Sequence, residues 1–244
     1  MTCEKPSGWG ADSLSQFLQV ADDNALATFA NMRPFFDRLA RIDALYRRLI
    51  CDLNNNPQWF AGFFFLRAHG AYLGACRLSV SGQLAESFMA LRGCLESSLY
   101  GLHVSKDPTR AEIWLRRHES DESITAVQGE FSIRNVMRTL ESASPELRIE
   151  AKRLYDIAID YGGHPNERAF TSSTLTRSTE SGTELVMAYL NVVPPALLFV
   201  LGEVARIGIC ALEVFGLVLP DSFTTRCSSD VEILKTQLYS KENG

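Results

Sequence analysis

Several signatures that identify enzyme classes are absent from this chain. It contains no glycine-rich phosphate loop, no GxGxxG fingerprint, no GxSxG elbow and no HExxH pair. Its six cysteines include no CxxC pair, so we expect buried free thiols in a reducing cytoplasm and no zinc site. Cofactor-dependent redox chemistry has no support in these patterns, and we expect neither a metal nor another cofactor.

An excess of positive charge is also absent. The chain has 24 Lys and Arg against 29 Asp and Glu, a net charge of −5. This balance argues against broad electrostatic binding to nucleic acid or to an anionic membrane, although it allows a local basic groove. Residues 1–17 contain no apolar stretch after a basic start, so we expect no secretory signal and a cytoplasmic location.

One apolar run, residues 193–219, is long enough to resemble a membrane span. It contains Glu203, Arg206 and Glu213, which fall on one side of a helix. Three charges near the middle of a span would be costly. We therefore expect a core helix with one solvent-facing or polar edge, and no membrane partner.

The spacing of apolar residues predicts a mainly α protein, a helical bundle that forms a single domain over residues 1–244. Thr-rich and β-branched residues around a turn at residues 180–182 predict one β-hairpin near residues 169–191. Capping and helix-breaking residues set the expected helix ends. The expected helices cover residues 13–29, 34–53, 57–80, 82–104, 108–118, 133–141, 145–161, 194–219 and 220–239.

The helix expected over residues 82–104 has charges on the face that should be buried. Arg92, Glu96 and His103 project within roughly 40° of one another, beside an apolar arc. The opposite face carries small residues that allow a neighbouring helix to approach closely. The arc consists of Leu84, Phe88, Leu91, Leu95, Leu99 and Leu102, and the small face of Gly93, Cys94, Ser97 and Gly101. This pattern predicts a central helix, packed on both sides, with a polar site.

The first candidate site combines Arg92 and Glu96 with Tyr100 and His103 on that helix. An Arg–Glu pair four residues apart can be a structural ion pair inside the bundle. The functional interpretation is a contact between Arg92 and an anion or a nucleotide phosphate, with Glu96 orienting the guanidinium. Both interpretations stay open at this point.

Two further candidates lie outside the central helix. In the segment 160–167, two glycines predict a left-handed helix end that places His164 in a tight turn, with Tyr161 and Asn166 beside it. His164 is either functional or a capping and hydrogen-bonding residue. Arg117 and His118 end a short helix, where they either complement its dipole or contact phosphate.

The spans RAHGAYLGACRLSVSGQLAESFMALRGCLESSLYGLHVSKDP, AEIWLRRH and RLYDIAIDYGGHPNERA, within residues 67–169, resemble a family of uncharacterised bacterial all-helical proteins. In that family an LRxxxE helix is followed by a Y…HP turn. It is similar to the HEPN (higher eukaryote and prokaryote nucleotide-binding) superfamily and its abortive-infection members. The resemblance implies a bundle with Arg92, Glu96 and His164 at one end, a homodimer, and an RNA- or nucleotide-directed activity.

The chain departs from the active HEPN ribonucleases in one respect. Those enzymes have an Arg followed four to six residues later by His on one helix, and no Arg–His pair here has that spacing. Cleavage of RNA would need a non-standard site with His164 as the acid–base group and Arg92 as the phosphate ligand. Similarity of fold alone does not confer activity.

Two functions therefore remain. The first is an RNA- or nucleotide-directed effector, a metal-independent ribonuclease of a bacterial defence or stress system. The second is a non-catalytic helical interaction protein in which Arg92, Glu96 and His164 form an internal brace. In either case the aromatic helix at 57–80 has more apolar surface than one compact bundle needs to bury, which predicts a homodimer.

Overall fold

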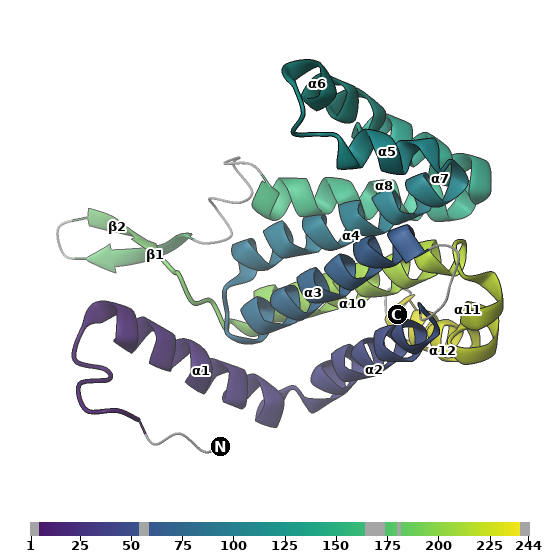
Figure 1. Cartoon of the computed structure of the whole chain (residues 1–244). Coiled ribbons are helices and arrows are strands. Elements are labelled where there is room, and N and C mark those ends of the chain that lie inside the picture. Colours follow the sequence, from purple (N-terminus) through teal and green to yellow (C-terminus); the bar gives the residue numbers. More distant parts are fainter. Residues whose placement is uncertain (1–4, 54–58, 164–173, 180–181, 240–244) are drawn as a thin grey trace.

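The computed structural model describes residues 5–53, 59–163, 174–179 and 182–239. It is a helical bundle with one β-hairpin, which confirms the predicted fold class (Figure 1). The elements are α1 (Ser13–Asn31), α2 (Arg33–Ile50), η1 (Cys51–Leu53), α3 (Trp59–Val80), α4 (Leu84–Lys106), α5 (Thr109–Leu115), α6 (Asp121–Glu130), α7 (Ile133–Ala143), α8 (Pro145–Ala158), η2 (Ile159–Gly163), β1 (Thr174–Thr179), β2 (Gly182–Met187), α10 (Pro194–Gly216), α11 (Pro220–Arg226) and α12 (Ser228–Tyr239).

The helix α4 is the centre of the bundle, as its sequence predicts. It contacts α3, α10, α7, α8 and η2, and α3 and α10 also contact each other. The apolar arc is buried: Leu91, Leu95 and Leu99 have no exposed surface. A tight turn at Gly82, which has φ +92°, joins α3 to α4, and the two helices lie side by side (Figure 1).

The prediction that the small face of α4 packs closely against a neighbouring helix is confirmed at Gly101 and wrong at Gly93. A Cβ atom on Gly101 would lie 2.9 Å from the ring of Phe215 in α10 and 3.3 Å from Cβ of Phe64 in α3. At Gly93 a Cβ atom would meet nothing within 4 Å. Close packing therefore requires the small residue at position 101 but does not require it at position 93.

The hairpin is present where the sequence predicts it. β1 and β2 pair antiparallel from Thr174↔Met187 to Thr179↔Gly182, and in Figure 1 they lie to one side of the helices. The amide of Asn191 then donates to the carbonyl of Gly82 over 2.8 Å. This bond ties the chain that enters α10 to the turn between α3 and α4.

The end of α8 differs from the prediction. The helix expected over 145–161 is regular only to Ala158 and continues as the π-helical turn η2. Gly162 does not adopt the left-handed conformation of a helix cap. A Cβ atom there would lie 2.4 Å from the carbonyl oxygen of Ala85 in α4. This glycine is needed because η2 packs directly on the α4 backbone.

Two other predictions need correction. The helix α6 was not expected, and the helix expected over 220–239 is interrupted at Cys227, where α11 ends and α12 follows. The apolar run at 193–219 forms α10, inside the bundle. Within the described part of the chain, no helix combines the length and hydropathy needed to cross a bilayer.

Candidate functional site

Arg92 and Glu96 form the predicted ion pair, and Tyr155 of α8 completes it. Nε of Arg92 donates to Oε1 of Glu96 over 2.8 Å. The hydroxyl of Tyr155 donates to the same carboxylate oxygen over 3.1 Å, and the Arg92 guanidinium lies 5.6 Å from the centre of the Tyr155 ring. The three side chains form a closed set of contacts that joins α4 to α8. We call them the Arg92 cluster.

The Arg92 cluster is partly exposed to solvent. The side chains of Arg92 and Glu96 retain 32% and 28% of their exposure. The hydrogen bond that Arg92 donates to Glu96 raises the pKa of Arg92, so the guanidinium is charged at all physiological pH values. Burial, followed by the charge of Glu96, raises the pKa of Tyr155, which keeps its hydroxyl protonated and able to donate.

Tyr100 lies on α4 one helical turn after Glu96, and the charges of Glu96, Arg117 and Arg92 act on it. The ring of Tyr100 packs edge-on against Phe64, Trp114 and Phe131. Burial and the charge of Glu96 raise the pKa of Tyr100, while Arg117 and Arg92 oppose that shift, so both cations act on its hydroxyl. His118, the next residue after Arg117, is exposed. Of the predicted site residues, the structure therefore brings Arg92 and Glu96 into direct contact, with Tyr100 one helical turn further along α4.

His103 belongs to a separate network. Its ring is 1% exposed and lies between Oγ1 of Thr139, at 2.7 Å, and Oε1 of Glu130, at 3.0 Å. Arg110 donates to Glu130 and to the carbonyl of His103. Burial and the charge of Arg110 lower the pKa of His103. This arrangement links α4 to α6 and α7.

Of the three candidates in the segment 160–167, one packs in the core and two lie outside the described residues. Tyr161 stacks on Phe88, with 5.3 Å between ring centres, and lies 5.1 Å from Phe199. It therefore contributes to the apolar packing between η2, α4 and α10. His164 and Asn166 lie outside the described residues, and their predicted roles stay predictions.

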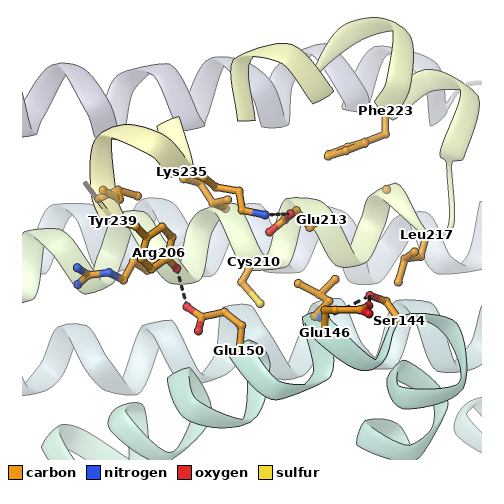
Figure 2. A pocket seen from close by; sticks show the side chains of 14 residues that line it. Ser144, Glu146, Glu150, Arg206, Cys210, Glu213, Leu217, Phe223, Lys235 and Tyr239 are labelled. Atoms are coloured by element: carbon orange, nitrogen blue, oxygen red, sulfur yellow. Dashed lines mark hydrogen bonds and ion pairs between the residues drawn. The ribbon is translucent and has the colours of Figure 1, made fainter. Parts of the chain in front are cut away.

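A second polar region lies between α8, α10, α11 and α12, where a cavity of about 500 Å³ opens. Figure 2 shows Cys210 near its middle, Glu213 and Lys235 bonded to each other on one side, and Glu150 bonded to Tyr239 on another. The cavity also contains apolar side chains. Its lining residues are Ser144, Glu146, Leu147, Glu150, Arg206, Ile209, Cys210, Glu213, Gly216, Leu217, Phe223, Lys235, Leu238 and Tyr239.

The charges around this cavity are buried to different degrees, from Glu203, which is nearly inaccessible, to Glu146, which is exposed. Glu203 is 2% exposed and accepts from Nη1 of Arg206 over 2.6 Å. Nζ of Lys235 lies 2.7 Å from Oε1 of Glu213. Burial raises the pKa values of Glu203 and Glu213, against the opposing effect of these cations.

The sequence indicated only part of this region. It showed that Glu203, Arg206 and Glu213 share one side of α10, but not that α8 and α12 cover that side. Tyr155, Lys235 and Tyr239 were missed, because each lies in a different helix from its partner. In the described residues, no three or more His, Cys, Asp or Glu side chains group so as to hold a metal ion.

Comparison with known proteins adds no relative to this description. No protein-family model matches the sequence, and neither the curated proteins nor the solved structures contain a match.

Proposed function

We propose that this protein is a non-catalytic helical interaction protein that assembles as a homodimer through the outer face of α3. The observation that carries the proposal is a stripe of large apolar side chains on that face. Trp59, Phe63, Leu66 and Leu73 are 61%, 59%, 48% and 38% exposed. Exposed apolar side chains that adjoin one another along a helix are typical of an interaction surface. We call these four residues with Gly70 the α3 stripe.

The spacing of the α3 stripe suits a partner helix. Positions 59, 63, 66, 70 and 73 follow the alternating steps of four and three that form the seam of packed helices. Gly70 is exposed, and a Cβ atom on it would meet nothing within 4 Å. The middle of the stripe therefore offers a place where a second backbone can approach closely.

A second copy of the same chain is the partner that complements this stripe. If two α3 helices cross antiparallel at Gly70, residues seven positions before and after it face each other. Phe63 of one copy then lies beside Arg77 of the other, and both side chains are exposed. A cation beside an aromatic face contributes about 0.5–1 kcal/mol at an exposed site. The contact would occur twice, as two-fold symmetry requires.

A neighbouring groove extends the apolar surface. It lies between α2 and α3, has a volume of about 390 Å³ and shares Leu73 and Arg77 with the outer face of α3. Phe36 and Ala40 of α2 form its other wall. Arg77 also pairs with Asp22 of α1, which fixes one end of the surface.

The Arg92 cluster supports a bracing role better than a catalytic one. Arg92, Glu96 and Tyr155 each have a partner within the cluster. Two of the four histidines, His69 and His103, are buried and bonded to carboxylates. Both are held in fixed positions inside the bundle, where substrate has little access.

The competing proposal is the RNA-directed effector. One observation favours it: the charges of Arg92 and Arg117 both act on the partly buried Tyr100, and two cations that act on one hydroxyl suit a phosphate. Its ribonuclease form requires His164 to act with them.

Light scattering on the purified chain tests the homodimer. We expect twice the 27.2 kDa of one chain for the wild type and 27.2 kDa for Leu66→Glu, which buries a charge in the proposed seam. Ile149→Glu, at an exposed position on α8, is the matched control and should remain dimeric. A monomeric wild type, or equal effects of the two substitutions, contradicts the proposed interface.

An RNA assay separates the two functions. We expect wild-type protein without added metal to leave a single-stranded RNA intact. Degradation that disappears in a folded Arg92→Ala variant would overturn the non-catalytic proposal and support the effector.

A further inference from the structure

We propose that the cavity between α8, α10, α11 and α12 binds a small amphiphilic cation, a primary amine that carries a short hydrocarbon chain. The proposal rests on the size, shape and charge of this cavity and is independent of how α3 assembles. Its volume of about 500 Å³ falls within the range of about 300–1,000 Å³ that is usual for small-molecule sites.

The charges of the lining favour a cation. Three carboxylates, Glu146, Glu150 and Glu213, face two cations, Arg206 and Lys235, which leaves one negative charge in excess. Both cations already hold a carboxylate: Lys235 binds Glu213, and Arg206 binds Glu203. An incoming anion would find both cations already paired. An incoming ammonium would neutralise Glu146, the lining carboxylate that is in none of the ion pairs formed by the described residues.

The residues behind the lining preserve this excess. Arg153 binds Glu150 and Arg206 binds Glu203, while Glu232 lies 3.8 Å from Lys235 and Arg38 acts electrostatically on Arg206. These neighbours add two carboxylates, Glu203 and Glu232, and two cations, Arg153 and Arg38. Oε2 of Glu203 is buried, and no described residue forms a hydrogen bond with it. Burial raises the pKa values of Cys210 and Tyr239, so both groups are neutral at pH 7 and do not alter the balance.

The apolar side chains of the lining favour a hydrocarbon chain on the ligand. Leu147, Leu217, Phe223 and Leu238 lie on the same cavity as the carboxylates. Figure 2 places Phe223 and Leu217 toward one end, where Ser144 and Glu146 also lie, and Glu150 with Tyr239 toward the other. The lining therefore offers a carboxylate and apolar side chains side by side, which suits a molecule with one charged group and a short hydrocarbon chain. Partial exclusion of water strengthens the attraction between ammonium and carboxylate.

Isothermal titration calorimetry with three six-carbon probes tests the proposal. Hexylamine, hexanoate and 1-hexanol share a hydrocarbon chain and differ in charge. We expect saturable binding of hexylamine at one site per chain, and at least tenfold weaker binding of the other two. Equal or tighter binding of hexanoate, or no saturable binding of hexylamine, would overturn the proposal.

Three variants locate the binding. Glu213→Gln removes a lining carboxylate and should weaken hexylamine binding at least tenfold. Glu146→Gln removes an exposed lining carboxylate, where little folding energy is at risk, and should weaken it severalfold. Glu232→Gln makes the same change at an exposed site on α12 that also lies near Lys235, and should leave binding unchanged. If Glu232→Gln weakens binding as much as the lining variants do, the effect comes from general surface charge and the proposed site is wrong.

Discussion

The helices α3 and α10 both pack on α4, and they differ in what lies on their other sides. α10 is covered by α2, α8, α11 and α12, and its charges are buried in pairs. α3 leaves Trp59, Phe63 and Leu66 exposed. The covered helix therefore carries polar groups where the sequence alone would suggest a solvated edge. The outer face of α3 carries apolar groups where a monomer would place polar ones, which the proposed assembly through α3 would explain.

Removing the buried ion pair of α10 should have the largest effect on stability. Arg206→Ala leaves the carboxylate of Glu203 buried without its cation, and we expect a loss of about 3–5 kcal/mol in the free energy of unfolding. Chemical denaturation monitored by circular dichroism measures this loss. Arg33→Ala is the control, since its pair with Asp37 is exposed and should contribute less than about 1 kcal/mol.

Overpacking the site where α4 meets α3 and α10 should have the next largest effect on stability. Gly101 lies between Phe64 of α3 and Phe215 of α10, so Gly101→Leu should overpack the core and cost about 1–3 kcal/mol. Gly93→Leu places the same side chain where a Cβ atom meets nothing and should cost less, close to neutral. Equal melting temperatures for the two variants would contradict the placement of α4.

The Arg92 cluster should respond more weakly than the pair on α10. Its ion pair is about one-third exposed, so Arg92→Ala should cost about 1 kcal/mol rather than the larger loss expected for a buried pair. Denaturation curves of Arg92→Ala and Arg206→Ala, measured side by side, compare the two regions directly. A larger loss of unfolding free energy in Arg92→Ala than in Arg206→Ala would contradict this ranking of the two ion pairs.

The smallest expected effect is the contribution of His103 to the pH dependence of the unfolding free energy. Its pKa is lowered by burial and by Arg110, so the unfolded chain takes up a proton more readily than the folded protein. The stability that neutral His103 contributes is therefore present above about pH 6.5 and is lost as the pH falls below it. We expect His103→Gln to reduce the loss of unfolding free energy between pH 7 and pH 5. An unchanged slope would exclude His103 as the cause.

Local sequence signals predicted most of the helices, because their ends depend on neighbouring residues. Ser144, for example, caps α8 by accepting a hydrogen bond from the amide of Leu147. The helix α6 was missed because Val127 is its only fully buried residue, which leaves almost no apolar periodicity to detect. Gly162 was misinterpreted because a helix cap and a close contact between helices require the same residue type.

The candidate sites depended on contacts between distant residues, which a single sequence does not specify. The Arg92–Glu96 pair is four residues apart on one helix, and it was predicted correctly. Tyr155 lies on another helix, and nothing local to it indicates that it donates to Glu96. For the same reason, the charges of α10 could be placed on one side of the helix but not under α12.

Disulfide trapping at the centre of the α3 stripe tests the proposed assembly most directly. In a background with Cys3→Ser and Cys51→Ser, Gly70→Cys places a thiol at the point where two antiparallel α3 helices would cross. Under mild oxidation we predict a covalent dimer on a non-reducing gel, because the paired Cα atoms would approach within the roughly 4.4–6.8 Å that a disulfide spans. Ile149→Cys, also at an exposed position but on α8, should stay monomeric on the gel. Equal trapping at both positions, or none at position 70, would contradict assembly through α3.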